Sequence, residues 1–142
     1  MKLASQIVRY ILIALVTSGI AFFIWLQGQY VTPILMYHHV KARPIKELNT
    51  VTPKVFEKQM SFLKRYGHKV LSLDEYIDIK KNGGKDPRGS IVITFDDGYE
   101  NNYLYAFPVL KQYHYPATIF VVSDMVGKDR FLTWNQIKEM QK

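Results

Sequence analysis

Two adjacent carboxylates, Asp96 and Asp97, stand between an apolar run and a glycine, in the order Ile91-Val92-Ile93-Thr94-Phe95-Asp96-Asp97-Gly98-Tyr99. The run has the β-branched and aromatic composition of a strand buried on both faces of a parallel sheet. In a barrel of parallel strands, polar residues that end such a strand lie at the face where chemistry takes place. We therefore predict that the two aspartates belong to a catalytic or binding site.

The two carboxylates can divide the work of a hydrolysis. Neighbouring carboxylates repel one another, and a divalent cation relieves that repulsion. One aspartate can ligate the cation while the other accepts a proton from metal-bound water. Gly98 permits backbone angles that a side chain would hinder, so that both carboxylates can point into one cavity. The alternative interpretation is a polar turn after a strand.

A second apolar run, Ile34–Tyr37, predicts another buried strand, which ends in the pair His38-His39. Because successive side chains of a strand face opposite sides, only one of these histidines is expected to face the mouth of a barrel. The alternative is that both are polar residues that leave a strand and ligate nothing.

The stretch Ile93–Tyr99 resembles the first motif of the polysaccharide deacetylase family, also known as the NodB homology domain or carbohydrate esterase 4 group. Pro33–Val40 follows the family pattern upstream, and Phe107–Leu110 and Pro116–Val121 follow it downstream. The resemblance covers nearly everything after the first thirty residues.

This resemblance implies roles for individual residues. Asp96 would be the catalytic base and Asp97 a ligand of a divalent metal ion, zinc or similar, in the removal of acetyl groups from N-acetylated polysaccharide. The pair Tyr37-His38 resembles the family's version of its strand, so we expect His38 to be the histidine with a catalytic role. A substitute metal site that uses His38 beside Asp97 is a further alternative.

Two motifs of the family are missing from this chain. The family takes two further metal ligands from a later His-(Ser/Thr)-x-x-His motif and a general acid from a later Leu-x-His motif. All histidines of the chain lie upstream of where those motifs belong: His38, His39, His68 and His114. We therefore expect the N-terminal part of a deacetylase domain, inactive or very weak as this chain.

The N-terminal stretch Ile7–Leu26 is almost entirely apolar, and from Tyr10 to Leu26 it carries no charge over 17 residues. This length is at the lower limit for a helix that crosses a bilayer. The alternative is a buried helix of a globular core, but a domain this small could hardly enclose a helix that is apolar all round.

We expect this stretch to be an uncleaved anchor, because its small residues Gly19 and Ala21 lie inside the apolar core rather than after it. Lys2 and Arg9 favour a cytoplasmic N-terminus and an extracytoplasmic remainder. Three basic residues beyond the apolar stretch reduce this bias: Lys41, Arg43 and Lys46.

The expected organisation is a cytoplasmic stub with a transmembrane signal-anchor over 1–30, followed by the deacetylase part over 31–142. The expected location is the cell membrane, with a single pass. The net charge of +7 would suit an anionic wall or membrane. No Lys/Arg run interleaved with aromatic residues is present, so we expect no nucleic-acid partner. The partners expected are the membrane and an N-acetylated polysaccharide.

Strand candidates alternate with helices, which indicates an α/β fold with parallel strands. Helices are predicted from Pro53 to Tyr66, from the capping box at Ser72, near Pro108 and from the capping box at Thr133. Strands are also predicted over 68–71 and 117–122, and a loop over 48–51. A closed (β/α) barrel of the NodB type has about eight strands and typically ~250 residues, so we expect a partial, open barrel of marginal stability.

Two other classes of function remain open. The first is a non-catalytic, membrane-anchored module that binds a glycan or a partner through the exposed half-barrel. The second is a phosphatase of the haloacid dehalogenase type, which also places aspartates after an apolar strand. That family spaces its aspartates Asp-x-Asp, whereas Asp96 and Asp97 are adjacent, so the sequence disfavours it.

Overall fold

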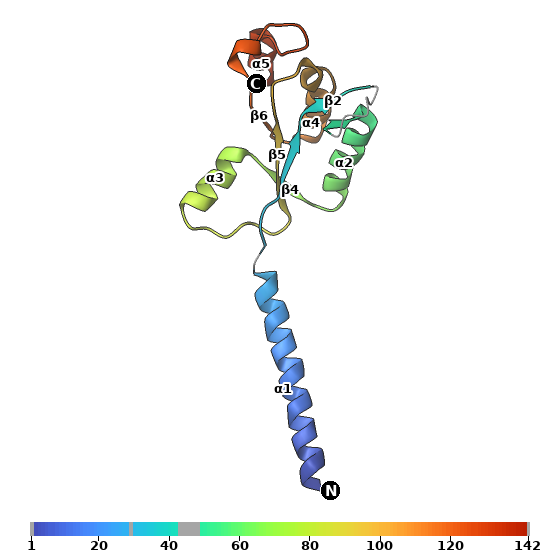
Figure 1. Cartoon of the computed structure of the whole chain (residues 1–142), viewed down its shortest axis with the longest axis vertical. Coiled ribbons are helices and arrows are strands. Elements are labelled where there is room, and N and C mark those ends of the chain that lie inside the picture. The colour runs from blue at the N-terminus through green and yellow to red at the C-terminus, as the bar shows by residue number, and fades with distance from the viewer. Residues whose placement is uncertain (1, 29, 43–48, 142) are drawn as a thin grey trace. The chain divides into compact units, whose positions relative to one another are not determined.

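The computed structural model describes residues 2–28, 30–42 and 49–141. It consists of two units, Met1–Val31 and Thr32–Lys142, and each is described by itself (Figure 1). Arg43 and Lys46, which entered the charge comparison, lie outside the described residues, as does Leu48 at the start of the predicted loop.

The first unit is a single helix, α1 (Lys2–Gln27). Its segment Ser5–Leu26 is long and apolar enough to cross a membrane, with a mean hydropathy of 2.2. A signal sequence near an N-terminus has the same length and composition. The hydroxyl of Thr17 donates hydrogen bonds to the carbonyls of Ile13 and Ala14, so this polar side chain is satisfied within the helix.

The second unit is built around a parallel sheet whose central strand is β5 (Ser90–Phe95). On one edge β5 pairs with β1 (Ile34–Tyr37), from Ile34 opposite Val92 to Tyr37 opposite Phe95. On the other edge it pairs first with β4 (Lys69–Leu71) and then with β6 (Thr118–Ile119). The predicted α/β class with parallel strands is confirmed.

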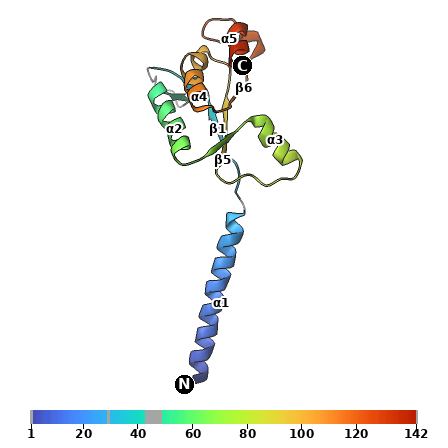
Figure 2. The ribbon, with the colours of Figure 1, turned by 180° about the vertical axis from the view of Figure 1, so that it is seen from behind.

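Helices lie on both sides of this sheet, with α2 (Pro53–Arg65) and α4 (Phe107–Tyr113) on one side and α3 (Leu73–Lys81) on the other (Figures 1 and 2). The core lies between the sheet and the α2/α4 side. There Phe56, Met60 and Leu63 of α2 contact Ile93 and Phe95 of β5 as one buried cluster. The helix predicted from Pro53 to Tyr66 therefore packs on the sheet through these three side chains.

Local sequence signals place the helix ends well. The Thr52 side chain caps α2, whose first residue is Pro53. Both predicted capping boxes form, at Ser72 for α3 and at Thr133 for α5 (Trp134–Met140). The break expected near Pro108 is a π-helical turn, η1 (Asn102–Ala106), which leads directly into α4.

Two predictions of local structure were wrong in part. The predicted loop over 48–51 contains a short strand, β3 (Thr50–Val51), which pairs in parallel with β2 (His39–Val40). The strand expected over 117–122 is only β6, because it pairs with β5 at two positions and a 3-10 turn, η2 (Ser123–Met125), follows closely. Propensity alone could not indicate where the pairing partner ends.

Large apolar side chains remain exposed after β6 and at the start of α5. Phe120 and Trp134 are 51% and 58% exposed, and Val121 and Val122 are also open to solvent. A hollow of about 1550 Å³, lined in part by Val121 and Trp134, lies between α4, β6 and α5. Such an uncovered apolar surface is what the expected open barrel would leave.

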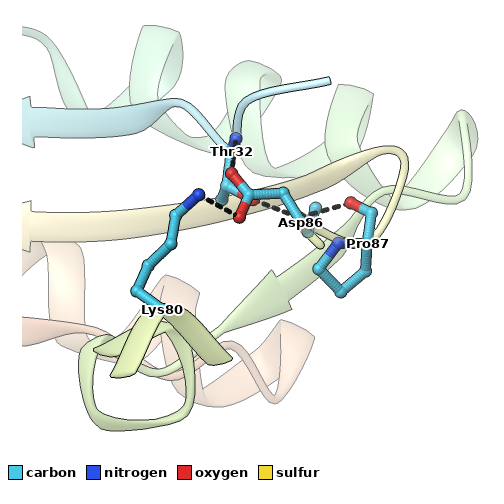
Figure 3. A network of polar contacts seen from close by, with 5 residues as sticks. Thr32, Lys80, Asp86 and Pro87 are labelled. Carbon is cyan, nitrogen blue, oxygen red and sulfur yellow. Dashed lines mark hydrogen bonds and ion pairs between the residues drawn. The ribbon is translucent and has the colours of Figure 1, made fainter. Parts of the chain in front are cut away.

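A buried carboxylate joins the start of the second unit to α3 (Figure 3). Asp86 has a fully buried side chain, accepts a hydrogen bond from the Thr32 backbone N–H at 2.7 Å and meets the Lys80 ammonium at 2.6 Å. The Ser90 hydroxyl donates its proton to the Pro87 carbonyl. In the 2.7 Å contact between the two hydroxyls, Thr32 is therefore the donor and Ser90 the acceptor. The Lys80 hydrogen bond and the Thr32 N–H lower the pKa of Asp86.

We expect Asp86→Asn to lower the melting temperature of the chain at neutral pH by several degrees. The folded pKa of Asp86 lies below its unfolded value, so its contribution is present above about pH 4 and is lost as the pH falls through the folded pKa. The gap in melting temperature between wild type and Asp86→Asn should therefore close on acidification. Circular dichroism melts across pH would check this, with the exposed Asp129→Asn as control. A gap that persists at low pH would contradict it.

Candidate active site

The register of β1 against β5 brings His38 and Asp96 to the same level of the sheet. Tyr37 is the last residue of β1 and lies opposite Phe95, the last residue of β5. The Asp96 N–H then donates to the Tyr37 carbonyl at 2.9 Å, which continues the ladder by one step. His38 and Asp96 therefore follow the carboxyl ends of neighbouring parallel strands.

Strand alternation turns these two side chains to one face. Ile93 and Phe95 of β5, with Tyr37 of β1, pack into the core on the α2/α4 side. The next residues, His38 and Asp96, therefore leave on the opposite face. There His38 Nε2 lies 3.9 Å from Asp96 Oδ2, and the two side chains are 25% and 29% exposed. This distance suits an ion pair rather than a direct hydrogen bond, and water reaches both groups.

The neighbouring Tyr37 belongs to the core and not to the site. Burial raises the pKa of Tyr37 to about 12, and its hydroxyl donates to Gln59 Oε1 at 3.0 Å. Its ring also contacts Phe56 and Phe95. A phenol that stays protonated at neutral pH is no base, so Tyr37 is a core residue and not a candidate base.

Asp97 leaves the strand differently from Asp96. Its φ is +67°, in the left-handed region, and Gly98 follows with φ +72°. Aspartate tolerates this conformation better than most residues do, and the sequence pointed only to Gly98. In the described part of the chain, the half-buried Asp97 carboxylate makes no hydrogen bond or ion pair. The structure thus brings His38 to Asp96 rather than to Asp97, and the catalytic and metal-binding roles of these residues stay predictions.

Gly98 anchors the turn after β5 through close packing. Its Cα faces Val121, and its carbonyl accepts a hydrogen bond from the Leu132 N–H at 2.9 Å. Tyr99 forms an isolated bridge with Phe131 and stacks on its ring at 5.0 Å. These contacts join the turn after the two aspartates to residues 131 and 132 and so hold the backbone next to Asp97 in place.

The donors present do not make up a metal site by themselves. Among residues 2–28, 30–42 and 49–141, no group of three or more His, Cys, Asp or Glu side chains could hold a metal ion. A catalytic zinc site uses three protein ligands. Among the described residues, the Asp97 carboxylate makes no hydrogen bond or ion pair that would compete with a metal.

Sequence reasoning missed the residues that hold this end of the sheet. Asn101 and Asn102 hydrogen bond to the segment 38–40, and Glu100 accepts a hydrogen bond from Gln136 of α5 at 3.1 Å. The available signal was two consecutive asparagines just before a predicted helix. Asparagine is a poor residue inside a helix, so its presence there favours side-chain hydrogen bonds to the backbone.

The family profile described as polysaccharide deacetylase matches residues 83–142, which include β5 and both aspartates. The chain is also 40% identical over 92 residues to the poly-beta-1,6-N-acetyl-D-glucosamine N-deacetylase of Staphylococcus epidermidis, and 37% identical over 112 residues to that of Staphylococcus aureus. The chain belongs to the polysaccharide deacetylase family. These alignments cover 65% and 75% of the chain but only 32% and 38% of the two relatives.

Solved structures of the family share this fold. The Streptococcus pyogenes deacetylase PplD in complex with acetate matches with a TM-score of 0.70 and 32% identity, over 78% of this chain and 51% of that one. IcaB from Ammonifex degensii matches with a TM-score of 0.71 and 30% identity, over 80% of this chain and 49% of that one. The chain thus spans about half the length of these two solved structures.

The Gly98 turn gives a prediction with a matched control. A Cβ at Gly98 would lie 2.9 Å from Val121 Cγ1 and 3.2 Å from Val121 Cβ, whereas a Cβ at Gly67, which has φ +68°, meets nothing within 4 Å. Both Gly→Ala changes carry the left-handed penalty of about 1–2 kcal/mol. Gly98→Ala adds overpacking of about 1–3 kcal/mol. Urea unfolding should therefore show Gly98→Ala to be the less stable variant; equal losses would contradict the packing described.

Proposed function

We propose that this chain supplies the base-bearing part of a polysaccharide N-deacetylase that acts on N-acetylated glycans of the cell envelope. The observation that carries the proposal is the placement of Asp96 beside His38, 3.9 Å apart at the ends of neighbouring strands. It is supported by relatives that are named poly-beta-1,6-N-acetyl-D-glucosamine N-deacetylases. A glycan rich in N-acetylglucosamine is accordingly the proposed substrate.

Asp96 is the proposed general base. It accepts a proton from a water molecule while the water oxygen attacks the carbonyl carbon of the acetamide group. The C–N bond of the resulting tetrahedral intermediate then breaks, the sugar nitrogen takes up a proton, and acetate leaves. His38 is proposed to orient the Asp96 carboxylate and to balance its charge from 3.9 Å.

Asp97 is the proposed ligand for the divalent ion, zinc or similar, that family membership suggests. The described residues do not fit such an ion alone, because they bring no three ligating side chains together. Further donors would have to join Asp97 for the ion to be held. The arrangement as a partial (β/α) barrel, open beside β6 and α5, fits this proposal, since the exposed apolar surface there can accept more structure.

A chimera tests the proposal most sharply. Residues 32–142 would replace the matching segment of the Streptococcus pyogenes deacetylase PplD, and acetate release from N-acetylglucosamine oligomers would be measured. We expect the chimera to be active and Asp96→Asn to lower its rate by about 10²–10⁴-fold, the usual contribution of a general base. Asp129→Asn, with a carboxylate 92% exposed, is the matched control and should leave the rate unchanged. A folded chimera that is inactive, or that Asp96→Asn does not affect, would contradict the proposal.

Assays of the 142-residue chain by itself distinguish an enzyme from the alternative, a non-catalytic glycan-binding module. Within the part of the chain that the structure describes, no three ligating side chains come together, which favours the module for this chain alone. We expect no acetate release with added divalent metal, and turnover that Asp96→Asn abolishes would overturn this expectation. Calorimetric binding of the oligomers to a metal-free sample would instead support the module.

We further propose that residues 1–30 form a cytoplasmic stub and transmembrane signal-anchor, with residues 31–142 outside the cytoplasm. The apolar segment Ser5–Leu26 supports this arrangement. The sequence contains no cysteine, so single cysteines report position cleanly. A membrane-impermeant maleimide should label Asp129→Cys in intact cells and Lys2→Cys only after permeabilisation. The reverse pattern, or release of the chain by alkaline carbonate, would contradict a membrane-spanning anchor.

A further inference from the structure

His39 is held in a different way from its neighbour His38. Its backbone begins β2, and the residue is only 9% exposed. Its imidazole lies against the Tyr99 ring, with centroids 3.7 Å apart and ring planes 34° apart. On its Nδ1 side, the imidazole meets the side-chain amide of Asn101 at 3.0 Å.

The hydrogen bonds of Asn101 determine the tautomer of His39. The Val40 N–H can only donate, and it meets the Asn101 side chain at 3.0 Å, so the oxygen Oδ1 must face Val40. The amide NH₂ of Asn101 then faces His39 Nδ1. Because an NH₂ group only donates, Nδ1 must accept and carry no proton. A neutral His39 therefore has its proton on Nε2.

In a second histidine of the same chain, His68, Nδ1 is a hydrogen-bond donor rather than an acceptor. His68 Nδ1 lies 3.0 Å from the carbonyl oxygen of Gly89. A carbonyl only accepts, so Nδ1 of His68 carries the proton. The two histidines thus provide an internal comparison, since the same ring atom accepts in one and donates in the other.

Asn102 holds the residue before His39. Its side-chain NH₂ donates to the His38 carbonyl at 3.1 Å, and Asn102 is 1% exposed. Two consecutive asparagines at the start of η1 therefore bind the His38 carbonyl, the His39 imidazole and the Val40 N–H. These contacts fix the backbone from which the His38 side chain extends toward Asp96.

We propose that Asn101 and Asn102 are positioning residues that fix residues 38–40 beside the segment that follows β5 and hold His39 neutral, with its proton on Nε2. His39 is then a structural group, and His38 alone of the pair faces Asp96. The tautomer follows from hydrogen-bond chemistry alone. Its consequence for catalysis, a fixed approach of His38 to Asp96, rests on the proposed function.

The tautomers can be measured without substrate or metal. The full chain, with ¹⁵N-labelled histidine, would be placed in detergent micelles at neutral pH, and long-range proton–nitrogen spectra would identify the protonated nitrogen of each ring. His38→Gln, His68→Gln and His114→Gln assign the signals. We expect the proton on Nε2 in His39 and on Nδ1 in His68. A proton on Nδ1 of His39 would overturn the proposal, whatever the chain's activity.

Asn101→Asp tests the cause of the tautomer. A carboxylate of nearly the same shape still accepts from the Val40 N–H, but it presents an acceptor to His39. We therefore expect His39 Nδ1 to gain a proton in this variant while His68 stays unchanged. An unchanged His39 in a folded variant would overturn the role of Asn101. Should the variant fail to fold, the wild-type tautomers still decide the matter.

Amide exchange tests Asn102 in the same way. Asn102→Ala removes the donor to the His38 carbonyl, so the adjacent Asp96 N–H, bonded to Tyr37, should exchange about fivefold to tenfold faster. The Val92 N–H, bonded to Pro33 at the far end of β1, should exchange at its wild-type rate. Equal acceleration at both amides would show general destabilisation and contradict a positioning role for Asn102.

Discussion

The pairing of β5 on both of its edges is the constraint on which the rest of the structure depends. β1 lies along one edge, while β4 and β6 share the other. The ladder continues to the end of the strand, where the Asp96 N–H donates to Tyr37 and the Phe120 N–H donates to Phe95 at 2.8 Å. A strand held so completely offers little freedom to the residue that follows it, and so the position of Asp96 is fixed by the backbone.

The same pairing gives two adjacent carboxylates different surroundings. Strand alternation carries Asp96 to the face where His38 also emerges, 3.9 Å away. Positive φ angles at Asp97 and Gly98 end that alternation at once. One carboxylate is therefore placed beside an imidazole, and the other makes no hydrogen bond or ion pair in the described ranges. Such a separation is what a site needs when one acid handles a proton and another binds a cation.

Much of this fold could be predicted from sequence, because its signals are local. The apolar run of β5, the proline and threonine at the start of α2 and the two capping boxes each indicate an element through its own residues. The hydrogen bonds from Asn101 and Asn102 to residues 38–40 could not be predicted, because they join positions more than 60 apart in the chain. The left-handed backbone conformation of Asp97 was not predicted for another reason: the glycine that follows was sufficient to explain the turn.

The central claim is that Asp96, and not Asp97, faces His38. Its most direct test is the response of the His38 imidazole resonances in the full chain to Asp96→Asn and to Asp97→Asn. Asparagine tolerates the left-handed conformation at 97, so the second variant keeps the turn and is a matched control. We expect Asp96→Asn to shift the His38 resonances and Asp97→Asn to leave them in place. A shift with Asp97→Asn and none with Asp96→Asn would contradict it.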